Sequence, residues 1–202
     1  MLLDSVLVWF RRDLRDYDHT ALDEALRRAR QVYCVFVFDR QILDALTERA
    51  DRRVEFIRQS VSELDAALRA RGGALLTRHA QADEEIPRLA AQLAVSGVFA
   101  NRDYEPLAKA RDEHVAAALR RQGRELSLFK DQVLLDGEEV LTGAGQPYTV
   151  FTPYKKAWLK RLTDDDWSPR TASRPGRLAV AVGADGVPTL AALGFARSDL
   201  PS

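Results

Sequence analysis

Short apolar runs recur along the first 130 residues and predict β-strands. They span 5–10, 32–38, 74–78, 97–101 and 125–129. The first two runs are almost continuously apolar, which is typical of strands covered on both faces of a sheet. We therefore expect five strands, with the first two at the centre of a core.

Helical patterns fill the intervals between the runs. The longest pattern has apolar residues three or four positions apart, which is the spacing of an amphipathic helix. Its apolar residues are Val54, Ile57, Val61, Leu64 and Leu68. Gly72 and Gly73 follow, and glycine commonly ends a helix because it adopts the left-handed conformation without strain.

The other helices are predicted from residues that start or end helices. Asp18 and Asp83 precede apolar patterns and can accept hydrogen bonds from the first backbone N–H groups of a helix. Pro106 suits the first turn of another helix, which Gly123 would end. Strands that alternate with helices form βαβ units. We therefore predict an α/β fold: a doubly wound, five-stranded parallel sheet with helices on both faces, similar to a Rossmann fold.

The carboxyl ends of the strands are where such a sheet binds its ligands, near the point where the strand order reverses. In this sequence the relevant ends lie at 10–12, 38–39, 79 and 101–103. A functional site is expected to draw its residues from these segments.

The composition changes after a basic helix predicted at 153–162, which would start at Pro153 and pack Trp158 and Leu162 inward. Residues 163–189 are rich in proline, glycine and aspartate and hold few large apolar residues. Such a composition is typical of a linker. We therefore predict one domain over residues 1–162 and a linker over residues 163–202.

Charge and cysteine content limit the classes of function. Thirty basic and thirty acidic residues give a net charge of zero, which argues against strong DNA binding by this chain alone, since DNA affinity rests on neutralising phosphates. The single cysteine, Cys34, excludes a disulfide framework, and three scattered histidines do not indicate a metal site. No apolar run approaches the ~20 residues of a membrane span, and the first ten residues lack a basic leader. We expect a cytoplasmic protein without a membrane partner.

No pattern of covalent catalysis or of phosphate binding is found. The first strand is followed by RRDLRDYD, which holds no glycine, whereas dinucleotide-binding and P-loop turns require glycine for close approach to phosphate. There is no G-x-S-x-G motif, and no histidine is indicated as a partner for Cys34. The residues that could carry function are therefore the charged ones at the strand ends.

Two charged clusters stand at these ends. The cluster after the first strand can be a salt-bridge network that fixes the turn, or one of its arginines can face a ligand. Its members are Arg11, Arg12, Asp13, Arg15 and Asp16. After the fourth strand, Asp103 and Glu105 can cap the next helix or accept hydrogen bonds from a ligand. Considered alone, Phe36 would belong to the core and Arg53 to the solvated surface.

Several segments resemble the DNA photolyase/cryptochrome family, in family order. VWFRRDLRDYD at 8–18 is similar to its opening signature, a strand ending in W-F-R-x-D-L-R with a D-N pair close behind, although His19 replaces the asparagine and leaves Asp18 as the expected cap. The other similar segments are DRQIL at 39–43, NRDYEP at 101–106, ARDEHVAAAL at 110–119, LTGAGQPYTVFTPYKKAW at 141–158 and PTLAALGF at 188–195. The resemblance spans nearly the whole chain.

The resemblance implies a two-domain parent protein. Its first domain, here residues 1–162, would hold a light-harvesting antenna chromophore, and residues 163–202 would be an interdomain linker truncated before a helical domain. That helical domain would bind FAD and use blue light to repair cyclobutane pyrimidine dimers in DNA, so the present chain alone would not be catalytic. A cryptochrome photoreceptor is the first alternative, and an unrelated nucleotide-binding α/β module is the second.

The same resemblance suggests the chromophore. Members that use methenyltetrahydrofolate carry an Asn-Glu pair where this chain has Leu107 and Ala108, so 8-hydroxy-5-deazaflavin or a flavin such as FMN is favoured. By position, Phe36 would pack on the ring and Arg53 would hold a polar edge, while Asp103 and Glu105 would accept hydrogen bonds. Weaker contacts at the rim would come from Arg12, Asp39, Lys109 and Arg111. An antenna needs orientation and rigidity rather than acid–base groups, which agrees with the lack of a catalytic motif.

Overall fold

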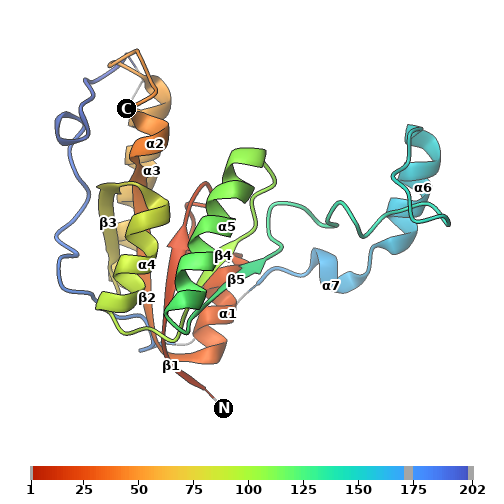
Figure 1. Ribbon diagram of the computed structural model, residues 1–202, viewed down its shortest axis with the longest axis horizontal. Helices are drawn as coiled ribbons and strands as arrows, with labels where there is room; N and C mark the ends of the chain where they lie inside the picture. The colour runs from red at the N-terminus through yellow and green to blue at the C-terminus, as the bar shows by residue number, and fades with distance from the viewer. Residues whose placement is uncertain (1, 171–174, 200–202) are drawn as a thin grey trace.

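A computed structural model describes residues 2–170 and 175–199. Five parallel strands form one sheet in the order β3-β2-β1-β4-β5, as Figure 1 shows. The strands are β1 Leu3–Phe10, β2 Ala29–Asp39, β3 Leu75–Ala80, β4 Gly97–Asn101 and β5 Glu125–Phe129. The predicted fold class is confirmed, and β4 and β5 begin and end at the predicted residues.

The helices that connect the strands cover both faces of the sheet (Figure 1). They are α1 Thr20–Arg28, α2 Arg40–Leu43, α3 Arg52–Ala70, α4 Ala82–Gln92 and α5 Pro106–Arg121. Leu22 of α1 and Leu68 of α3 pack with Val8 on one face, whereas Ile86 of α4 and Leu119 of α5 belong to the core on the other face. Since the strand order reverses at β1, the carboxyl end of β1 is the expected place for a ligand.

Two predicted helix caps are wrong. Asp18 lies at a φ of 44°, and its carboxylate accepts a hydrogen bond from the backbone N–H of Arg170. His19 caps α1 instead, because its Nδ1 accepts the N–H of Leu22 at 3.1 Å. Similarly, α4 begins at Ala82, so Asp83 lies within its first turn. In both cases the helix is fixed by contacts with distant residues; for α4, these include the 3.4 Å hydrogen bond from the Ala82 N–H to Asp39.

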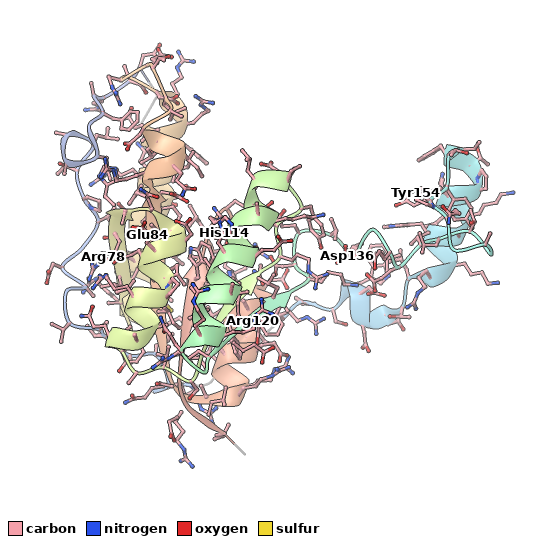
Figure 2. The ribbon with its side chains drawn as sticks, in the orientation of Figure 1. Arg78, Glu84, His114, Arg120, Asp136 and Tyr154 are labelled. Carbon is pink, nitrogen blue, oxygen red and sulfur yellow. The ribbon has the colours of Figure 1, made fainter. Side chains whose placement is uncertain are left out.

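Residues 147–167 form a projection that we call the arm. It carries α6 Phe151–Arg161 and α7 Asp164–Trp167, and neither helix has a buried residue. Figure 2 shows Tyr154 of α6 far from the sheet. The basic helix therefore starts two residues earlier than predicted, and its expected inward packing is wrong, since Trp158 and Leu162 are only half-buried.

The chain after residue 174 returns to the domain. Backbone hydrogen bonds link Val32 of β2 to Arg177 and Ala179 at 2.8 and 2.9 Å. The last short helix is η1 Ala191–Leu193, and Leu193 and Phe195 are buried in the core on the α1 and α3 face. This part of the predicted linker thus packs along the sheet, while the domain boundary at residue 162 stays a prediction. None of the described helices is long and apolar enough to cross a membrane.

Candidate ligand-binding site at the carboxyl ends of the strands

A cavity of about 630 Å³ lies where β1 and β2 end. Phe36 and Phe38 of β2 form part of its wall, with their ring centroids 4.8 Å apart and nearly perpendicular. The alternation of side chains along a strand places these two residues on the same face of the sheet. Phe56 and Ile57, from the first turns of α3, also line the cavity. The cavity therefore has the size and the aromatic lining of a site for a flat organic ligand.

Phe56 and Ile57 were not identified as site residues from the sequence. Ile57 was assigned to the buried stripe of the helix, but it is 37% exposed, and Phe56 is 61% exposed. Both side chains line the cavity instead of packing in the core. The signal that could have identified them is Phe56 itself, a large aromatic residue outside the three-four spacing of its helix.

A buried polar cluster fixes the turn after β1. Asp13 Oδ2 lies 2.8 Å from His19 Nε2 and accepts a hydrogen bond from Asn101 Nδ2 at 2.6 Å. The Oδ1 of Asn101 accepts the backbone N–H of Ala21 at 2.8 Å, which ties the end of β4 to α1. Burial raises the pKa of Asp13, but hydrogen bonds from His19 and from the backbone N–H of Arg11 outweigh it and lower that pKa to about 2.

The two arginines after β1 have different roles. The side chain of Arg11 is buried, and its Nη1 binds both carboxylate oxygens of Asp112 at 2.6 and 2.7 Å. Arg12 is half exposed and lines the cavity, with its guanidinium 3.3 Å from Asp103 and 3.0 Å from Glu105. Arg11 thus stabilises the turn, as the first interpretation expects, and Arg12 lines the cavity, while its contact with a ligand stays a prediction.

Asp39 and Arg111 form the inner polar wall of the cavity. Asp39 Oδ1 accepts the backbone N–H groups of Gln41 and Ala82 at 3.1 and 3.4 Å. Burial raises the pKa of Asp39, and burial followed by the nearby charge of Arg11 lowers the pKa of Arg111. Each side chain is thus held in a place where its charged form is disfavoured.

Five of the eight site residues predicted from the sequence line this cavity: Phe36, Arg12, Asp39, Asp103 and Arg111. The other three do not. Glu105 contacts the cavity residue Arg12, and Lys109 lines a separate surface pocket with Tyr104 and Lys130. Arg53 is 73% exposed and pairs with Asp51 at 2.5 Å. A role in binding stays a prediction for all eight residues.

No set of three or more metal-ligating side chains is found among the described residues. The residues that line the cavity include neither histidine nor cysteine. The geometry defines a ligand-binding domain of the doubly wound α/β class, in which a cavity opens at the strand ends.

Comparison with known proteins identifies the family within this class. The model of the DNA photolyase family matches residues 6–175, and the chain belongs to this family. It is 36% identical over 153 residues to a deoxyribodipyrimidine photo-lyase of Synechococcus sp., covering 76% of this chain and 31% of that protein. It is 38% identical over 164 residues to the Escherichia coli protein of the same name, covering 78% and 34%.

A solved structure agrees with this assignment. A class III photolyase from Agrobacterium tumefaciens superimposes with a TM-score of 0.76 and 26% identity over 95% of this chain and 38% of that one. The chain thus spans between about 30 and 40% of the length of these three relatives. It corresponds to their N-terminal α/β part.

Proposed function

We propose that the cavity binds a flat light-absorbing cofactor, and that the chain is the light-harvesting domain of a photolyase. The observation that carries this proposal is the cavity of about 630 Å³ with aromatic walls, placed at the strand ends of a domain from this family. When bound, such a pigment absorbs light and passes the excitation energy through space to a second chromophore. The protein has to hold the pigment rigidly and keep water from it.

The lining residues suit a tricyclic ring. Phe36 and Phe56 offer aromatic surfaces for stacking, and Arg12, Asp39, Asp103 and Arg111 offer polar contacts at the rim and inner wall. Arg53 lies three and four residues before Phe56 and Ile57, hence on the same face of α3. If its guanidinium leaves Asp51, it can reach the mouth of the cavity and hold a polar edge of the ligand.

The proposed pigment is 8-hydroxy-5-deazaflavin or a flavin such as FMN. Methenyltetrahydrofolate is disfavoured, because Leu107 is 86% exposed and Ala108 is buried, and neither side chain can form the hydrogen bonds of the Asn-Glu pair in folate-binding members. Both also lie outside the cavity lining. Titration of the chain with each of the three pigments tests this choice. We expect saturable changes in absorption with deazaflavin or FMN and weaker binding of the folate.

The activity proposed for the parent protein is blue-light repair of cyclobutane pyrimidine dimers in DNA, in the cytoplasm. Its FAD would be held by the other two thirds of the parent protein, which would be the partner of the present domain. The curated relatives quoted above are named deoxyribodipyrimidine photo-lyases, which favours repair over cryptochrome signalling. The experiment is to illuminate dimer-containing DNA with the full-length protein, and with this chain alone as a control that should be inactive.

A further inference from the structure

The guanidinium of Arg111 is buried and only partly paired. Its side chain is 14% exposed, and its carbon Cζ lies 4.9 Å from the ring centroid of Trp9. Its Nε is buried without a hydrogen-bond partner among the described residues. The two terminal nitrogens lie 3.8 Å from Asp39 Oδ2 and 3.6 Å from Asp112 Oδ1, and both distances exceed a hydrogen bond. Arg111 therefore has donors to offer to a ligand in the cavity.

The nearby carboxylates differ in whether they have an oxygen atom that is still free to accept a hydrogen bond. Asp112 is occupied by the two short contacts with Arg11, and Asp103 faces Arg12. Asp39 uses Oδ1 for the N–H groups of Gln41 and Ala82, whereas no described group donates a hydrogen bond to its Oδ2. This oxygen, which lies beside Arg111, is thus an unused acceptor at the cavity wall.

An unused acceptor next to unused donors favours a particular kind of ligand edge. An anionic group would satisfy Arg111 but be repelled by Asp39, and a cationic group would do the reverse. A neutral edge with a carbonyl oxygen beside an N–H satisfies both residues. Leaving buried polar groups unpaired is costly, so a ligand that pairs both of them gains affinity over one that does not.

We propose that Asp39 and Arg111 recognise an amide edge of the bound ring, with Arg111 donating to its carbonyl oxygen and Asp39 Oδ2 accepting its N–H. The pyrimidine ring of a flavin, a deazaflavin or a pterin carries such an edge. This inference rests on the proposed function, and it assigns the orientation of the pigment: the pyrimidine end points to the inner wall, and the other end points to the mouth near α3.

The test compares lumiflavin with 3-methyl-lumiflavin, in which a methyl group replaces the proton of that N–H. Dissociation constants are measured by quenching of the flavin fluorescence. We expect methylation to weaken binding to the native chain about 10- to 100-fold, as for the loss of a hydrogen bond to a charged group. Asp39→Asn should abolish this difference. Its Oδ1 is still needed by the N–H groups of Gln41 and Ala82, so its amide nitrogen would face the cavity and repel the flavin N–H.

Two further variants complete the test. Arg111→Met keeps an unbranched, flexible side chain but removes the guanidinium donors, and it should weaken the binding of both flavins. Phe56→Leu, the control, should weaken both flavins equally and preserve the effect of methylation. Circular dichroism and urea unfolding check that each variant is folded, and a variant that is not folded is replaced by Asp39→Ser or Arg111→Leu.

The outcomes separate this inference from the proposed function. If both flavins bind equally well to the native chain, or if Arg111→Met leaves lumiflavin affinity unchanged, the assigned edge is wrong although the cavity still binds a pigment. If no flavin, deazaflavin or folate binds to the native chain, the proposed function fails and the inference fails with it.

Discussion

The sheet buries its apolar side chains, whereas the arm leaves most of its own exposed to solvent. In the sheet, Phe10 and its neighbours on β1 are buried between helices on both faces. In the arm, Phe151 is 72% exposed and Trp167 is 59% exposed. The same kinds of side chain therefore stabilise one region and leave the other without a core.

This difference shows where the stability of each region must come from. The sheet gains from burial, whereas α6 has 11 residues, a length at which an isolated helix is marginal in water. The arm instead has local contacts, such as the capping box in which Thr163 and Asp166 bind each other at 2.8 Å. The arm should consequently open far more readily than the sheet.

Proteolysis should separate the two regions most strongly. Trypsin can cut the arm after Lys155, Lys156 or Lys160, and it can cut α1 after Arg27 or Arg28. Cleavage in the sheet domain requires opening that approaches global unfolding, so we expect the arm to be cut at least ~1000-fold faster. Mass spectrometry of the early fragments gives the sites. Early cleavage in α1 would show that the sheet is not the more stable region.

A matched pair of phenylalanine substitutions should show the next largest difference. Phe10→Ala removes a fully buried ring and should reduce the free energy of unfolding by about 3 to 5 kcal/mol. Phe151→Ala removes an exposed ring and should change it by less than about 0.5 kcal/mol. Urea unfolding measures both. A large loss for Phe151→Ala would mean that the arm packs against the domain in solution.

The fold could be predicted from the sequence because strands that are buried on both faces appear as short, almost continuously apolar runs. Strands β4 and β5 were placed correctly, since apolar runs bounded by glycine or charge have few other interpretations. The cap at His19 could not be predicted, because histidine seldom caps a helix and its position depends on Asp13 and Asn101 from other elements.

The candidate site was only partly predictable for a related reason. The strand-end residues Asp39 and Asp103 followed from the topology, which brings all carboxyl ends to one edge of the sheet. Whether Ile57 packs in the core or lines a hollow depends on how far α3 lies from β2, and no local pattern encodes that distance. The pairing of Arg53 with Asp51 is local, yet the sequence offers several carboxylates that could have competed for it.

The buried amide of Asn101 provides a third comparison. Asn101→Ala leaves the N–H of Ala21 without its acceptor and removes a donor from Asp13. Each unpaired group costs roughly 1 to 3 kcal/mol, so the free energy of unfolding should fall by about 3 kcal/mol. Thr163→Ala breaks an exposed hydrogen-bonded cap in the arm and should change global unfolding by less than about 0.5 kcal/mol. Equal effects in the two variants would contradict the assignment of the polar cluster as part of the folded core.

The smallest expected effect is the pH dependence of the same cluster. The pKa of Asp13 is lowered from 3.8 to about 2 in the folded protein, so the unfolded chain binds this proton more readily than the folded one. The resulting stability is fully present above the unfolded value and is lost as the pH falls from about 5 to 2, with a total of about 2 kcal/mol.

Urea unfolding of the native chain and of Asp13→Asn, measured from pH 6 to pH 2, isolates this contribution. The native chain should be the more stable at pH 6, and the difference between the two should shrink by about 2 kcal/mol on acidification. In the arm, the pKa of Asp166 is also lowered by the backbone and side chain of Thr163, but this pair is exposed to water. Asp166→Asn should therefore follow the native curve at every pH. A constant difference between native and Asp13→Asn would mean that Asp13 is paired equally well in the unfolded chain, and that the cluster does not distinguish the sheet from the arm.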